Sequence, residues 1–183
     1  TSIGNGAFRS CRGLTSVTIP NSVMSIGQHA FYHTGIKEMK LPHSLKVIGN
    51  AAFAECKRLK AVTIPEGIET LELDAFACCD SLANVTLPST LKSIKRGVFW
   101  QCRSISEIHI PASVTEIGEY SFYYCDSLRH VYNHAAIPQE VISLFKPKDS
   151  ITVHVPAASV ELYRQASYWK DLNIVGDIVG LVP

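Results

Sequence analysis

The fold is decided by a 23-residue unit that recurs along the chain and is complete in His43-Ser-Leu-Lys-Val-Ile-Gly-Asn-Ala-Ala-Phe-Ala-Glu-Cys-Lys-Arg-Leu-Lys-Ala-Val-Thr-Ile-Pro65. Phenylalanine returns every 22 or 23 residues, a proline closes most units, and a cysteine usually follows three residues after the phenylalanine. Three residue types in phase indicate stacked repeats. The expected ladders are Phe8, Phe31, Phe53, Phe76, Phe99 and Phe122, and Cys11, Cys56, Cys79, Cys102 and Cys125, with Thr34 in the second repeat.

Each unit contains two short apolar stretches joined by turns. The segment L-x-x-V-x-I alternates apolar and polar residues, which predicts a strand with one buried face, and proline then ends it because it has no N–H to donate. The pair V-x-x-I predicts a second buried stretch on the opposite wall. A glycine often follows it, as at Gly27 and Gly49, where a positive φ is expected to help. The A-F-x-x-C segment is predicted to be one helical or 3₁₀ turn.

One unit has too few apolar groups to fold alone, so the units must share a core by stacking. The sequence therefore predicts a right-handed solenoid in which strands ~4.8 Å apart carry ladders of equivalent side chains. Residues 1–134 form six repeats, of which the first is truncated, so we expect the natural chain to continue upstream of Thr1. Asn133 and His134 replace the template Ile and Pro and are expected to end the regular stacking.

Residues 135–183 depart from the template and are expected to form an α+β cap packed on the last repeat. Within it, residues 139–145 are predicted to form a short helix, 151–155 a strand and 157–168 a second helix. Trp169 is expected to plug the end of the core, and a last strand begins at Asn173. The side chains of the second helix expected to point inward are Val160, Leu162, Tyr163 and Ala166.

The repeat motif resembles the BspA-type leucine-rich repeat family over roughly residues 1–134, through the strand segment L-x-x-V-x-I and the element Ile-Gly-x-x-Ala-Phe-x-x-Cys. The stretch from Ile151 to Val175 is similar to the closing segment of such proteins from Bacteroides-type bacteria. The resemblance implies a leucine-rich repeat solenoid in a secreted or surface-anchored bacterial protein. It also implies an adhesin that binds host matrix proteins, plasma proteins or other cells, with no active site shared by the family.

Composition excludes several classes of function. Apolar residues make up 46% of the chain and charged residues 18%, so a packed core is expected rather than disorder. A formal net charge of +1 gives no electrostatic footprint for nucleic acid. No apolar run approaches the ~18 residues that suggest a membrane-spanning helix. We expect a monomer with no cofactor and no nucleic-acid partner.

No catalytic site is predicted. The chain contains no G-x-S-x-G, no P-loop and no G-x-G-x-x-G after a strand. A linear cysteine ladder does not converge four ligands on one zinc ion, so the ladder thiols are interpreted as buried and structural. Cys78 lies outside the ladder, beside Cys79, and is open to exposure, a vicinal disulfide or a reactive thiol. His109 and His130 on neighbouring strands offer two ligands at most, and no metal site is predicted.

Two surfaces are candidates for binding a protein or a glycan, which is the predicted function; the alternative is a structural spacer that presents another domain and has no ligand of its own. The first is the outward, concave side of the strand layer, where repeat proteins bind extended ligands. The second is an aromatic edge beside the phenylalanine ladder: Tyr32, Trp100, Tyr123 and Tyr124. The concave candidates are Lys37, Glu38, Lys40, Lys60, Thr63, Asn84, Thr86, Glu107, His109, Arg129, His130 and Tyr132.

Overall fold

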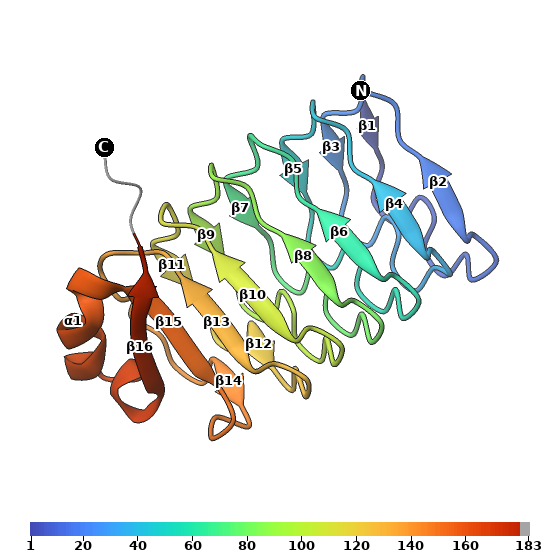
Figure 1. The fold of residues 1–183 in the computed structure, drawn as a ribbon. Coiled ribbons are helices and arrows are strands. Elements are labelled where there is room, and N and C mark those ends of the chain that lie inside the picture. Colours follow the sequence, from blue (N-terminus) through green and yellow to red (C-terminus); the bar gives the residue numbers. More distant parts are fainter. Residues whose placement is uncertain (180–183) are drawn as a thin grey trace.

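The computed structural model describes residues 1–179, and it is an elongated solenoid of parallel strands (Figure 1). The longer strands follow one another along one side of the solenoid, and the shorter strands lie behind them along the opposite side. All strand pairs are parallel, and neighbours in space come from successive repeats. The predicted leucine-rich repeat solenoid is therefore confirmed.

The long-strand layer holds the L-x-x-V-x-I segments, and we call its outward side the sheet face. Equivalent residues pair across it, so Val17 lies opposite Met39 and Val62 opposite Val85. The strands are β2 (Ser16–Thr18), β4 (Glu38–Lys40), β6 (Ala61–Thr63), β8 (Asn84–Thr86), β10 (Glu107–Ile110), β13 (His130–Asn133), β15 (Thr152–Pro156) and β16 (Asn173–Ile178). Because every strand presents the same face, outward positions of successive repeats form rows across the layer.

The short-strand layer holds the ends of the V-x-x-I segments. Its isoleucine and leucine side chains point into the core, and Ile26, Ile48 and Leu71 are completely buried. The strands are β1 (Ser2–Ile3), β3 (Ser25–Ile26), β5 (Val47–Ile48), β7 (Thr70–Leu71), β9 (Ser93–Ile94) and β11 (Glu116–Ile117). The second buried wall that the repeat pattern predicts is therefore present.

A column of stacked phenylalanine rings runs along the core. Successive ring centroids lie 5.1 to 5.8 Å apart from Phe8 to Phe122, with ring planes within 16° of parallel. Phe145 extends the column by one more rung at 6.0 Å. It does so because β14 (Phe145–Lys146) pairs with β12 (Phe122–Tyr123). Sequence analysis placed Phe145 in a helix and missed this rung, although it follows Phe122 at the repeat spacing.

The A-F-x-x-C segment is not a helical or 3₁₀ turn; before Ala157 the described residues contain no helix. The chain instead makes linked turns, in which Ala52 N–H donates to Gly49 C=O and Cys56 N–H to Phe53 C=O. Alternate N–H groups donate sideways to the next repeat, as Phe53 does to Ala75 over 2.8 Å and Glu55 to Ala77. Side-by-side pairing between repeats therefore replaces hydrogen bonding within a helix.

Positive φ angles lie elsewhere than expected. From Phe8 to Phe122 they occur two residues before and two residues after each phenylalanine, for example at Ala51 (φ 51°) and Glu55 (φ 62°). Gly27 and Gly49 do not have positive φ. Glycine is needed at these positions because there is no room for a side chain. A Cβ on Gly49 would lie 2.7 Å from the backbone nitrogen of Gln28 in the preceding repeat.

The ladder cysteines make a repeated contact that the sequence pattern did not reveal. Each buried thiol donates to the backbone carbonyl of the phenylalanine in the preceding repeat, with Cys56 reaching Phe31 at 3.1 Å and Cys102 reaching Phe76 at 3.1 Å. All six cysteines are free. Phe8 and Cys11, expected in the core, are exposed, because no coil covers the first rung in the described structure.

Asn133 does not end the stacking, which corrects the interpretation made from the template. Strand β13 pairs in register with β10 and with β15, and β15 pairs with β16, so the long-strand layer continues to Ile178. Asn133 is fully buried, and its amide contacts the side chain of Gln139 at 2.9 Å and the Ala135 N–H at 3.2 Å. A satisfied amide can occupy a core position because its polar atoms keep hydrogen-bond partners.

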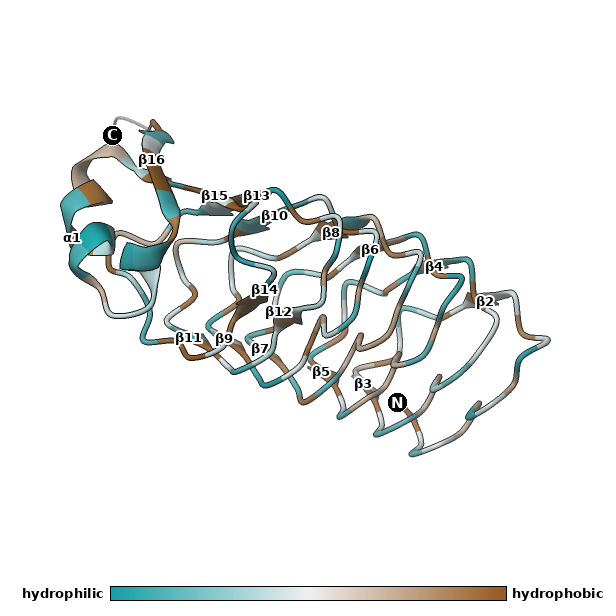
Figure 2. Ribbon diagram, turned by 90° about the horizontal axis from the view of Figure 1, so that it is seen from below, coloured by the Kyte–Doolittle hydropathy of each residue, from teal (hydrophilic) through white to brown (hydrophobic). Residues whose placement is uncertain are grey.

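The rest of the C-terminal segment closes the end of the core (Figure 2). Trp169 is completely buried, and its indole N–H donates to the Gln139 carbonyl at 2.8 Å. Residues 157–168 contain helix for only part of their length, and Leu162, expected to point inward, is 50% exposed. Residues 139–144 are not helical. The helical elements are η1 (Ala157–Ser159), α1 (Val160–Gln165) and η2 (Trp169–Asp171).

Candidate ligand-binding surfaces

The structure places the predicted concave candidates together on the sheet face. Eleven of the twelve are exposed, and Tyr132 is half-buried. Lys37 and Lys60 stand at the basic N-terminal half, where with Arg58 and Ser81 they line a shallow depression of about 240 Å³. Thr63, Asn84 and Thr86 form a small, neutral middle. The large side chains gather at the C-terminal end of the layer.

Three rings form a stacked row across β10, β13 and β15. His109 stacks on Tyr132 with ring centroids 4.3 Å apart and planes 6° from parallel. Tyr132 stacks on His154 at the same 4.3 Å. Strand register produces this row, because His109 pairs with Tyr132 and Tyr132 pairs with His154. We call His109, Tyr132 and His154 the ring row.

The ring row is held by a hydrogen-bond chain at its C-terminal end. His130 Nδ1 lies 3.0 Å from His154 Nε2, and His154 Nδ1 lies 2.8 Å from a carboxylate oxygen of Asp177. An ionised carboxylate can only accept, so His154 donates from Nδ1 to Asp177. Asp177 thereby fixes the orientation of the His154 ring that contacts His130.

His154 and Asp177 also belong to this surface, although neither was among the predicted site residues. Their position became visible only when β15 and β16 proved to continue the layer. A signal did exist, since His154 follows Tyr132 by 22 residues, one repeat length. His109 and His130 were considered together as metal ligands; His109 stacks on Tyr132, whereas His130 forms its hydrogen bond with His154. Within residues 1–179, no group of three metal-ligating residues could hold a metal ion.

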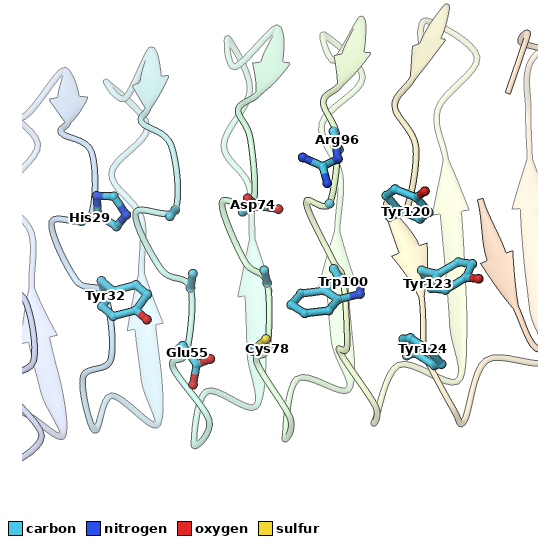
Figure 3. Close-up of a pocket in the computed structure, with 14 residues that line it drawn as sticks. His29, Tyr32, Glu55, Asp74, Cys78, Arg96, Trp100, Tyr120, Tyr123 and Tyr124 are labelled. Atoms are coloured by element: carbon cyan, nitrogen blue, oxygen red, sulfur yellow. The ribbon is translucent and has the colours of Figure 1, made fainter. Parts of the chain in front are cut away.

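The aromatic edge contains a groove of about 500 Å³ (Figure 3), which we call the edge groove. Its shape follows from the residue directly after each phenylalanine, where Tyr32 and Trp100 flank Ala54 and Ala77 in the two intervening repeats. The two small residues leave the hollow, and the rings wall it. All four predicted aromatic-edge residues line it, and the full set is His29, Tyr32, Ala51, Ala54, Glu55, Asp74, Ala77, Cys78, Arg96, Gly97, Trp100, Tyr120, Tyr123 and Tyr124.

Most rings of the edge groove already have a cationic side chain over them. The Arg9 guanidinium lies 5.2 Å from the centre of Tyr32, and Arg96 lies 5.5 Å from Tyr120. Lys146 lies 5.4 Å from Tyr124 and 5.7 Å from the Tyr123 ring. Among residues 1–179, Trp100 has no ring or cation stacked on it.

Cys78, for which exposure was left open, lines the edge groove and is buried, with 8% of its surface exposed. It forms no disulfide with Cys79. Burial raises the pKa of the Cys78 thiol to about 12, and the Glu55 carboxylate acts in the same direction. A thiol with this pKa is almost entirely protonated near neutral pH, and thiolate is the reactive form. Cys78 is therefore a poor nucleophile here.

Residues 1–143 match the family model of the BspA type leucine rich repeat region in six copies. A leucine-rich repeat protein from Bacteroides ovatus is 27% identical, with a TM-score of 0.71 over 85% of this chain and 40% of that one. A leucine rich cell surface protein from Faecalibacterium prausnitzii is 25% identical, with a TM-score of 0.61 over 87% of this chain and 60% of that one.

A leucine-rich repeat protein from T. pallidum is 28% identical, with a TM-score of 0.62 over 69% of this chain and 71% of that one. The chain thus spans about half the length of the first two relatives. A search of curated proteins found no match. Because the family model covers most of the chain and the coils stack as it requires, the chain belongs to the BspA-type leucine-rich repeat family.

Proposed function

We propose that this chain is a non-catalytic adhesion module of a secreted or cell-surface bacterial protein and that it binds a protein ligand through the sheet face. The ring row carries the proposal. Tyrosine is enriched among the residues that dominate binding energy at protein interfaces, and Tyr132 is fixed between two imidazoles before any ligand arrives. Fixing the side chain in advance lowers the entropy cost of binding.

The shape and charge of the sheet face support a protein ligand. The layer is open and extends over eight strands, which suits a broad contact better than a small molecule. Lys37, Lys40 and Lys60 make the N-terminal half of the sheet face basic, and such charges speed the approach of an acidic partner. The cell-surface description of the Faecalibacterium prausnitzii relative supports the proposed location. Within residues 1–179, no helix has the length and apolar composition to cross a bilayer.

The test is a binding screen of the purified chain against immobilised host matrix and plasma proteins. We expect at least one ligand to be bound, and Tyr132→Ala to weaken that binding about tenfold or more, as loss of a hot-spot residue does. Val47→Ala, an exposed apolar residue on the opposite layer, is the control and should bind normally. Binding that survives Tyr132→Ala would remove the ring row from the site, and a screen without any ligand would favour a structural spacer.

A further inference from the structure

We infer that the edge groove is a second binding site and that it takes a neutral oligosaccharide. The groove lies along the turns that contain the phenylalanines and not on the sheet face, so it is independent of the surface proposed above (Figure 3). Its volume of about 500 Å³ is within the usual range for pockets that hold small ligands and is too small to seat a protein surface.

The length of the groove is set by the repeat spacing. Tyr32 and Trp100 are three coils apart, which corresponds to ~14 Å at the strand spacing of a sheet. Between them the floor is made of alanine side chains at positions 54 and 77, so the hollow is long, shallow and smooth. A short chain of sugar rings has this shape.

Trp100 provides the stacking surface. The tyrosine rings of the groove are paired with Arg9, Arg96 or Lys146, whereas the Trp100 indole has no such partner among residues 1–179. The axial C–H groups of a pyranose carry partial positive charge and pack against the electron-rich face of an indole. A neutral sugar therefore fits the free ring without displacing the cations already in place.

A carboxylate lines the same groove as the indole. Asp74 is half-buried, and within residues 1–179 its side chain forms no hydrogen bond or salt bridge. Its Oδ1 fills the space that a Cβ on Gly97 would occupy, three residues before Trp100. Two adjacent sugar hydroxyls can both donate to one carboxylate, and hydrogen bonds to a charged acceptor are the strong ones. Of the two carboxylates that line the groove, Glu55 pairs with Lys57 at 3.3 Å, so Asp74 is the one left to disfavour an acidic sugar.

The backbone of the groove floor argues against a peptide. Peptides that add to an exposed edge use free backbone groups of the receptor. Here the N–H groups already donate along the column, with Asp74 donating to Arg96 at 3.1 Å and Cys78 donating to Trp100 at 2.7 Å. Recognition must therefore come from side chains, and those present are an aromatic face and a carboxylate.

The experiment is calorimetric titration of the whole chain with maltohexaose, cellohexaose and β-1,4-mannohexaose, with a hyaluronan hexasaccharide as the acidic probe. We expect saturable binding of at least one neutral probe and at least tenfold weaker binding of the acidic one. Binding should also change the tryptophan fluorescence, because Trp100 lines the groove whereas Trp169 is completely buried.

Three variants locate the site. Trp100→Ala and Asp74→Asn should each weaken the neutral probe about tenfold, whereas Asp149→Asn, an exposed carboxylate outside the groove, should bind as the wild type does. Ala77→Tyr fills the hollow at a position where other repeats already carry a ring, and it should abolish binding. Circular dichroism confirms that each variant folds.

The proposal is overturned if none of the neutral probes binds, if the acidic probe binds equally well, or if Trp100→Ala and Ala77→Tyr bind normally. If the sugar experiment fails, the proposed function still stands provided that the chain binds a protein ligand and Tyr132→Ala weakens that binding. Conversely, sugar binding that persists in a chain with no protein ligand would overturn only the function proposed for the sheet face.

Discussion

The first and last rungs of the described phenylalanine column differ in what covers them. At the N-terminal end, Phe8 is 36% exposed and Cys11 is exposed, so the first rung faces solvent. At the C-terminal end, Phe145 is 2% exposed and is covered by Trp169 and Tyr168, with ring centroids 6.3 Å from each. The comparison shows that a repeated apolar ladder supplies stacking but cannot close its own end.

Closing the end requires residues that the repeat does not contain. Asn133 and Gln139 form a buried amide pair, and Gln139 also donates to the Val114 carbonyl at 2.8 Å. Tyr163 is buried and donates to the Ala135 carbonyl at 2.9 Å. These polar contacts satisfy backbone groups that the next repeat would otherwise pair, which explains why the closed end departs from the template.

The largest expected difference between the two ends comes from truncating their terminal rings. Phe145→Ala should lower the free energy of unfolding by about 3–5 kcal/mol, because a fully buried ring leaves a cavity. Phe8→Ala should cost about 1 kcal/mol, because its ring is already partly in water. Urea denaturation of both variants measures the difference, and equal losses would show that the two ends are closed to the same degree.

The next effect tests the polar closure. Asn133→Ile restores the template residue, yet it should destabilise the chain by about 2 kcal/mol, because the Ala135 N–H and the Gln139 side chain lose their partner in the core. Adding Gln139→Leu should recover part of that loss, since a polar partner no longer remains buried. Thermal melts of the single and double variants decide this, and a stabilising Asn133→Ile would contradict the role given to the amide pair.

A smaller loss of stability is expected from a substitution on the exposed short-strand layer, which lies between the two ends of the solenoid. Glu116 accepts hydrogen bonds from Lys95 at 2.9 Å and from Ser93 at 2.8 Å, and these two contacts, the first most strongly, lower the pKa of its carboxyl below the ordinary value of 4.5. Glu116→Gln should cost a few tenths of a kcal/mol at neutral pH, as exposed ion pairs do.

The pH dependence of that difference has a defined sign. A carboxyl whose pKa is lower in the folded state stabilises the fold above its unfolded pKa, and the contribution is lost as pH falls through the folded pKa. The gap between wild type and Glu116→Gln should therefore close on acidification below pH 4.5. Stability curves measured across this range test it, and a gap that widens in acid would exclude the assigned contact.

The smallest expected effect on stability comes from labelling Cys11, the exposed thiol of the first repeat, while the buried thiols stay unreacted. A thiol reagent at neutral pH should label Cys11 quickly without changing the melting temperature, because Cys11 is exposed. The other five thiols should react only in denaturant, since they are buried and burial raises the pKa of Cys56, Cys78 and Cys125 to about 12. Labelling of a second thiol in the folded chain would show that one of the coils opens.

The sequence by itself determined the repeat, the core and the outward rows. Phe53, Val62 and Ile64 could be placed inside because a strand and a fixed period leave few alternatives, and the same logic put Lys40 and Tyr132 on the sheet face. The aromatic edge was also visible in advance, because Tyr32 and Trp100 follow the phenylalanine at a fixed offset.

Only the tertiary structure decided the hydrogen-bond chain from His130 through His154 to Asp177 and the hollow beside Trp100. The histidine chain depends on the register of β15 and β16, whose sequences depart from the template, so only the 22-residue spacing from Tyr132 to His154 pointed to it. The hollow depends on which side chains are missing between two rings, and Cys78 is buried by neighbours from other coils. A repeat pattern determines the backbone position and the face of each side chain, whereas packing determines which side chains of neighbouring coils are in contact.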